Sequence, residues 1–144
     1  MKSLFFKYFL ILSTLFLLFG CKALVSKQSL PVELQRQWML TSIVGYTKEQ
    51  LMKNKAQLDL TLHSGNIANL GCGNFSVEVS GIVDDKIKFK TKDNPFKNCI
   101  KTEAIEYVFR NEMAKVNRYE IGGHFLKLYH NDQLLLKFVA SDWD

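Results

Sequence analysis

The sequence lacks an apolar run long enough to cross a membrane. Its uncharged N-terminal stretch lasts 13 residues, from Tyr8 to Gly20, whereas a membrane-spanning helix needs about 20 apolar residues. The chain of 144 residues also lacks internal repeats and low-complexity segments. Together with the overall composition, these absences argue against a disordered, collagenous or multidomain protein and favour one folded domain.

Sequence signatures of enzymes are absent as well. There is no GxSxG elbow, HExxH pair, Walker loop or dinucleotide fingerprint. His63, His124 and His130 are far apart in the sequence, so we expect solvated or hydrogen-bonded structural roles for them. Asp84-Asp85 lacks the alternating oxygen ligands of a calcium loop, which favours a plain turn. The sequence therefore predicts no catalytic residue, no metal site and no cofactor.

The first 20 residues have the pattern of an export signal. Lys2 and Lys7 precede the apolar run from Tyr8 to Phe19, and the small residue Gly20 follows it. Removal of this segment takes two of the 19 basic residues, which leaves 17 against 14 acidic ones and lowers the net charge from +5 to about +3. This modest charge argues against a protein that binds nucleic acid through charge alone.

The end of this segment, Leu18-Phe19-Gly20-Cys21, resembles the lipobox of bacterial lipoproteins, although Phe19 is bulkier than the residue usual there. The resemblance implies that Cys21 carries a thioether-linked diacylglycerol and an acylated amine, and two or more chains anchor a protein stably. Lys22 in place of Asp implies passage to the outer membrane. We therefore predict a signal peptide over residues 1–20, a lipidated Cys and tether over 21–35, and a domain over 36–144.

The chain beyond residue 36 alternates apolar and polar residues with the period of β-strands. The alternation is clear around Trp38 and Leu40, over residues 58–63 and 75–80, and near the end, where Leu134, Leu136 and Phe138 are expected to face inward. Gly71-Cys72-Gly73-Asn74 predicts a bulge or sharp bend, and Gly122-Gly123 predicts a two-residue hairpin loop. We count about eight short strands.

Two segments instead favour helix. Glu103 to Lys115 places apolar side chains at three- and four-residue spacings, with Thr102 as the expected cap. Thr47 to Gln50 has the spacing of a capping box and predicts a short helix through Asn54. The predicted fold is mainly β (α+β), a small antiparallel curved sheet or barrel with one amphipathic helix packed on it.

One strand has a row of positive charges. Lys86, Lys88, Lys90 and Lys92 alternate with Ile87, Phe89 and Thr91, so the four ammonium groups share one face. Lysines on a soluble face that protect a sheet edge explain this pattern. Contact with anionic envelope material, such as lipid headgroups or acidic glycan, is the functional alternative.

The three cysteines fit an exported protein if Cys21 is lipidated, because Cys72 and Cys99 then remain as a pair. In an oxidising compartment such a pair is expected to form a disulfide. Two buried thiols and half of a metal site are the alternatives, but no CxxC pair supports the metal site.

The order of these landmarks resembles that of the META domain, the domain of HslJ-like bacterial lipoproteins. The matching elements are Trp38-Met39-Leu40, Gly71-Cys72-Gly73-Asn74-Phe75, Cys99 ahead of the helix, and Tyr119-Glu120-Ile121 through Leu126-Lys127-Leu128. Two departures are Gly73 where the family usually has Asn, and Phe96-Lys97-Asn98 before the second Cys. The resemblance implies a lipocalin-like antiparallel barrel with paired cysteines and a role in stress response or envelope integrity.

Sequence and resemblance together predict a non-enzymatic, monomeric envelope lipoprotein that acts as a binding or scaffold module. Its expected partners are the membrane, through the lipid anchor, and an envelope protein or anionic envelope polymer, with no nucleic acid. One alternative is an inhibitor of an exported hydrolase such as lysozyme, which would use the loop from Lys92 to Asn98. The other is a lipocalin-like carrier of a small apolar ligand.

Overall fold

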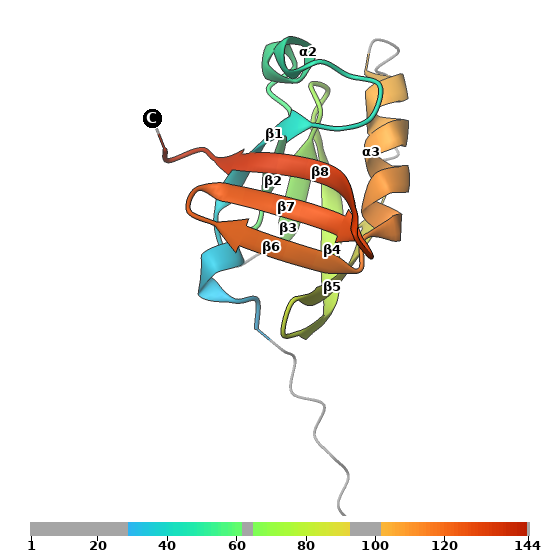
Figure 1. Ribbon diagram of the computed structural model, residues 1–144. Coiled ribbons are helices and arrows are strands. Elements are labelled where there is room, and N and C mark those ends of the chain that lie inside the picture. Colours follow the sequence, from blue (N-terminus) through green and yellow to red (C-terminus); the bar gives the residue numbers. More distant parts are fainter. Residues whose placement is uncertain (1–28, 62–64, 93–101, 144) are drawn as a thin grey trace, which may run out of the picture.

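The computed structural model describes residues 29–61, 65–92 and 102–143, and shows eight antiparallel strands that close into a barrel (Figure 1). The strands follow one another around the barrel in chain order, and β8 pairs with β1. This architecture confirms the mainly β fold predicted from the alternating pattern. The strands are β1 (Gln37–Ser42), β2 (Gln57–Asp59), β3 (Asn66–Asn69), β4 (Asn74–Val83), β5 (Lys86–Lys92), β6 (Arg118–Gly122), β7 (Phe125–His130) and β8 (Gln133–Ala140).

Side chains of the protein itself fill the interior of the barrel. Trp38, Phe109 and Phe138 are the largest fully buried side chains, and Phe75 meets Phe109 edge to face with ring centroids 5.9 Å apart. The Trp38 indole N–H donates to the Leu34 carbonyl at 3.0 Å, so the one polar atom of this ring is satisfied. The core is therefore a packed interior.

The packed domain begins before residue 36. A 3₁₀ turn, η2 (Val32–Leu34), carries the fully buried Leu34, and Leu30 packs against the core. These residues belong to the segment that the sequence assigned to the tether. The buried core runs from Leu34 to Ala140, so a chain that begins at Lys22 contains every described element of the barrel.

The predicted amphipathic helix is confirmed as α3 (Glu103–Lys115). Ile105, Phe109 and Met113 form its buried stripe, and the helix packs against β5. The predicted side-chain cap is wrong: Thr102 occupies the cap position, but its hydroxyl makes no capping bond. With φ −118° and ψ 1°, Thr102 departs from the extended conformation in which a cap oxygen reaches the N–H groups of the first turn.

The second predicted helix is confirmed as α2 (Lys48–Lys53), and its capping box is complete. The Gln50 backbone N–H donates to the Thr47 hydroxyl, and the Thr47 backbone N–H donates to the Gln50 side chain at 2.8 Å. The helix stops at Asn54, as the sequence predicts. Leu51 anchors it to the core.

Two details near the C-terminus differ from the predictions. Gly122 pairs with Phe125, so the hairpin loop is Gly123-His124, one residue later than expected. In β8, Leu128 lies opposite Leu136 and Tyr129 lies opposite Leu134, which leaves Leu135 as a bulge. The extra residue reverses the alternation, so Leu134 is exposed although the period-2 pattern placed it inside.

The predicted bend at Gly71 to Asn74 is confirmed as the turn between β3 and β4. Gly71 has φ +114°, and a Cβ atom there would lie 3.1 Å from the Thr102 Cγ2 and 3.2 Å from the Asn54 backbone oxygen. Glycine is favoured because this backbone conformation strains other residues and this close approach leaves little room for a Cβ atom. The turn therefore lies between the C-terminal end of α2 and the start of α3.

Candidate functional site

The four lysines predicted to share a face do so on β5. Lys86, Lys88, Lys90 and Lys92, here called the lysine face, are exposed on the outside of the barrel, whereas Ile87 and Phe89 are buried inside. Lys92 forms an ion pair with Glu78 on β4, and Lys90 lies opposite Glu78 in the strand pairing. The hydrogen bond from Lys92 lowers the pKa of the Glu78 carboxyl. One carboxylate therefore offsets part of the charge of the lysine face.

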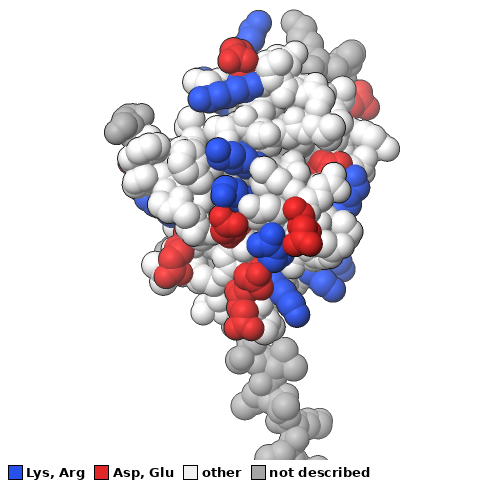
Figure 2. Space-filling model, in the orientation of Figure 1, with Lys and Arg blue, Asp and Glu red and all other residues white. Residues whose placement is uncertain are grey.

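Basic and acidic side chains are interspersed on the face of the protein drawn in Figure 2. Lys127 pairs with Glu120 at 2.8 Å across the β6–β7 hairpin, and Arg36 pairs with Asp142 at 2.7 Å. The bond from Lys127 lowers the pKa of the Glu120 carboxyl. Exposed pairs of this kind contribute little to stability.

The cysteines predicted to be modified lie partly outside the described residues. Cys21 and Cys99 are outside them, and Cys72 is half-buried in the β3–β4 turn. Lipidation of Cys21 and the pairing of Cys72 with Cys99 therefore stay predictions. Within the described part of the chain, no helix has the length and apolar character needed to span a membrane.

Two of the three histidines can be placed, since His63 lies outside the described residues. His124 is in the β6–β7 loop and stacks on Trp143 with ring centroids 4.3 Å apart. The His130 Nδ1 lies 2.8 Å from the Lys115 carbonyl oxygen. Asp84 and Asp85 form the β4–β5 turn, with Asp84 at φ +54°. Among residues 29–61, 65–92 and 102–143, no three His, Cys, Asp or Glu side chains are grouped as metal ligands.

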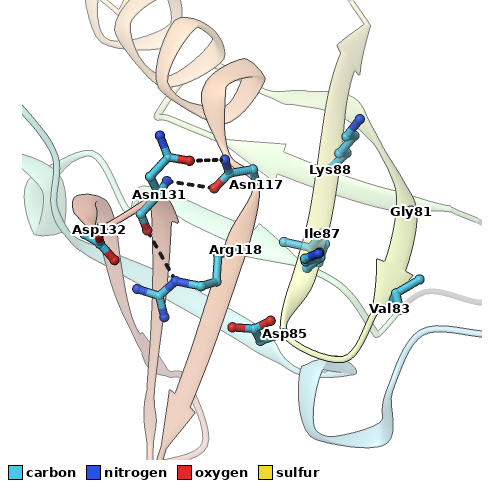
Figure 3. Close-up of a pocket in the computed structure, with 10 residues that line it drawn as sticks. Gly81, Val83, Asp85, Ile87, Lys88, Asn117, Arg118, Asn131 and Asp132 are labelled. Atoms are coloured by element: carbon cyan, nitrogen blue, oxygen red, sulfur yellow. Dashed lines mark hydrogen bonds between the residues drawn. The ribbon is translucent and has the colours of Figure 1, made fainter.

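A pocket of about 420 Å³ lies where β5 and β6 diverge. The two strands share one pair in register, Lys86 with Arg118. Asn117 and Asn131 join the start of β6 to the β7–β8 turn with two 2.8 Å hydrogen bonds, and the Arg118 Nε donates to the Asn131 carbonyl at 3.3 Å (Figure 3). These hydrogen bonds hold one wall of the pocket in place, and the Tyr119 backbone N–H joins β6 to the turn before β5 by donating to the Asp85 carbonyl at 2.8 Å.

A larger hollow of about 840 Å³ lies on the outside of the barrel beside α2. We call it the α2 groove. It is formed by the outward faces of β1 and β8, by α2 and the residues after it, and by two aromatic residues near the C-terminal end of the fold. Its lining residues are Met39, Leu40, Thr41, Ser42, Lys48, Leu51, Met52, Lys55, Ala56, Gln57, Phe125, Lys137, Val139 and Trp143.

Large apolar side chains in the α2 groove remain accessible to solvent. The exposed fractions are 38% for Met39, 54% for Met52 and 48% for Trp143. Trp143 is held by the stack on His124 and by an edge contact with Phe125, whose centroid is 6.0 Å away. An exposed apolar patch with a polar rim is typical of a binding surface.

The charges along the α2 groove have one sign. Lys48, Lys55 and Lys137 are the ionisable residues of the lining, and none of the described lining residues is Asp or Glu. The Lys137 ammonium lies 4.6 Å from the centroid of the Phe125 ring, a cation–π geometry that keeps this charge at the groove. The site can therefore offer an apolar surface and positive charge together.

Sequence reasoning did not find the α2 groove, because its residues come from four distant stretches of the chain. Met39 and Val139 stand at outward positions between inward-facing residues, where a polar residue is expected. These apolar residues at outward strand positions were the one sequence signal that could have indicated an exposed apolar surface. The pairing of β1 with β8 then brings Met39 opposite Val139.

Comparisons with known proteins do not identify a family. No family model matches the chain, and neither a curated protein nor a solved structure matches it significantly. The residues and their geometry therefore carry the functional argument.

Proposed function

We propose that this chain is a non-enzymatic, lipid-anchored envelope protein whose barrel is a binding module, with the α2 groove as its binding face. The export signal and the Leu-Phe-Gly-Cys sequence ending at Cys21 support the anchor. The order of the landmarks from Trp38 to Leu128 supports membership of the META family and, with it, a role in stress tolerance or envelope integrity.

One observation carries the binding proposal: the α2 groove has an accessible apolar lining, and its charges are all positive. The first described residues lie at one end of the barrel, and α2, a wall of the groove, lies at the other (Figure 1). A protein tethered through its N-terminus would hold this wall away from the attachment point. The residues between Cys21 and the first packed residue, Leu30, would then act as a tether that lets the barrel meet a partner.

Photo-crosslinking in intact cells tests this function. A photoreactive amino acid replaces Met52 in the groove, and a matched variant carries it at Tyr107 on α3, which is at least as accessible. We expect a specific adduct from position 52, lost when Met39→Glu is added, and none from position 107. Equal labelling from both positions, or none from position 52, would contradict the proposal.

The anchor has a separate test. Cys21→Ser is expected to abolish incorporation of labelled fatty acid and to release the domain from the membrane fraction, while Cys72→Ser leaves lipidation unchanged. Fatty-acid labelling that persists in Cys21→Ser would rule out this anchor.

The alternative functions receive less support from the geometry. A carrier that holds its ligand inside the barrel needs an empty interior, and the described interior is filled by Trp38, Phe109 and Phe138. An inhibitor would use the loop from Lys92 to Asn98. Lys92 is paired with Glu78, and residues 93–98 lie outside the described part of the chain.

A further inference from the structure

We propose that the α2 groove binds a single-chain amphiphile with an anionic headgroup, such as a long-chain carboxylate. The acyl chain would lie along the apolar lining, and the headgroup would meet the lysines of the rim. This inference rests on the proposed function, because it names the ligand class of the same groove.

The size and lining of the groove fit an acyl chain. Its volume of about 840 Å³ lies in the range of sites for small organic ligands, about 300–1,000 Å³. Met39 and Met52 flank the hollow, and methionine is unbranched and adaptable, which suits a flexible chain. Phe125 and Trp143 add aromatic surface at the other side.

The charges select the headgroup. Lys48 and Lys55 come from α2 and the turn after it, and Lys137 comes from β8, so cations flank the hollow on two sides. The neighbouring carboxylate of Asp142 is bound by Arg36, whose Nη2 lies 2.7 and 3.0 Å from its two oxygens. An anion would gain from all three lysines, whereas a cation would be repelled by them.

A small amphiphile fits better than a protein segment. A standard protein interface covers about 800 Å² on each partner, and a bound helix needs a trough that takes several successive anchor residues. The α2 groove is instead a single hollow with cations at its edges. An acidic peptide is the competing ligand, and the outcomes given below distinguish it from an amphiphile.

The two tryptophans provide a direct assay. Trp143 lines the groove, whereas Trp38 is fully buried in the core. Bromine quenches indole fluorescence at short range, so 12-bromododecanoate can be titrated against the lipid-free chain that begins at Lys22. We expect saturable quenching below the micelle concentration, and no saturable quenching in Trp143→Phe, which retains Trp38 as a control.

Charge variants test the headgroup. The triple variant Lys48→Gln/Lys55→Gln/Lys137→Gln is expected to weaken binding at least about tenfold, since it removes every positive charge that the lining offers to the anionic headgroup. The matched control is Lys86→Gln/Lys88→Gln/Lys90→Gln on the lysine face, which should bind as the parent does. Thermal unfolding of each variant establishes that it is folded.

The outcomes separate this inference from the proposed function. Equal affinity for 12-bromododecanoate and its trimethylammonium analogue would overturn the anionic assignment. Absence of saturable quenching, with a protein adduct still formed from position 52 in cells, would overturn the amphiphile and leave the groove as a protein-binding face. Absence of both would overturn the ligand and the proposed function together.

Discussion

His124 and Trp143 stack face to face, with ring centroids 4.3 Å apart and an angle of 5° between the planes. The contact joins the β6–β7 loop to the last described residue, 19 positions later in the sequence. It holds the indole beside Phe125, where it forms one wall of the α2 groove. His124 therefore positions one wall of the α2 groove, although its own side chain is not among the lining residues.

Removal of this stack should loosen the groove wall. In His124→Ala, we expect acrylamide to quench Trp143 more strongly, because an aromatic pair of this kind contributes about 0.5–1.5 kcal/mol. The fluorescence of the buried Trp38 should not change. His130→Ala is the control, since His130 contacts the Lys115 carbonyl and not Trp143. Unchanged quenching in His124→Ala would show that the stack does not hold the indole.

A side chain at Gly71 should destabilise the fold. Gly71→Ala places a Cβ atom against Thr102 and Asn54 at a backbone φ of +114°, and we expect it to lower the free energy of unfolding by about 1–3 kcal/mol. Gly122→Ala is the control, because no atom lies within 4 Å of a Cβ there, and it should change stability by less than about 0.5 kcal/mol. Urea unfolding measures both, and equal effects would contradict the close approach.

The hydroxyls of Thr102 and Thr47 should have opposite effects on stability. The Thr102 Oγ1 is buried and has no hydrogen-bond partner among the described residues, so Thr102→Val should be neutral or stabilise the fold by up to about 2 kcal/mol. Thr47→Val removes the α2 cap and should cost about 1 kcal/mol. Thermal and urea unfolding measure both changes. Destabilisation by Thr102→Val would reveal a partner for this hydroxyl.

The ion pair between Arg36 and Asp142 should make stability depend on acid pH. Hydrogen bonds from Arg36 hold the pKa of the Asp142 carboxyl below its ordinary value. A carboxyl whose pKa is lower in the folded state stabilises the fold above its unfolded pKa and loses this effect as the pH falls through the folded value. Asp142→Asn should therefore lower Tm at pH 7, and the difference should shrink as the pH falls below the ordinary aspartate pKa of about 3.9.

The control for this pH effect is Asp132→Asn in the β7–β8 turn, where no ion pair occurs among the described residues. Its Tm should follow that of the parent at every pH. A constant difference between Asp142→Asn and the parent from neutral to acid pH would exclude the ion pair as the cause.

The predicted disulfide between Cys72 and Cys99 should contribute to stability. Its loop spans 27 residues of the sequence, and the loop-entropy relation then gives about 3–4 kcal/mol. Reductant should lower the free energy of unfolding of the parent by this amount and leave Cys72→Ser/Cys99→Ser unchanged. Alkylation of both cysteines without reductant would rule the disulfide out.

The sequence alone was sufficient for the strands and both α-helices, because their signals are local, but it did not predict η2. Alternation of apolar residues predicts the strands, and the spacing of Ile105, Phe109 and Met113 predicts α3 with its observed bounds. The capping box at Thr47 predicts the start of α2. The period of two also places the lysine face outside, since successive side chains of a strand point to opposite sides.

Features that depend on strand register could not be read from the sequence. Leu134 follows the alternation of Leu136 and Phe138, but pairing with β7 forces a bulge at Leu135 and turns Leu134 outward. The hairpin loop falls one residue after Gly122 because Gly122 pairs with Phe125. Register is a property of two strands, so neither strand specifies it alone.

By itself the sequence determined that the domain is β-rich, because the period of its apolar residues is a local property of the chain, and it predicts an export signal ahead of that domain. Only the tertiary structure decided where ligands can meet it. Met39, Met52, Lys137 and Trp143 form one groove because the closure of β1 on β8 and the packing of α2 against β1 bring them together. Contacts between residues this far apart depend on the closed barrel, and no local pattern encodes them.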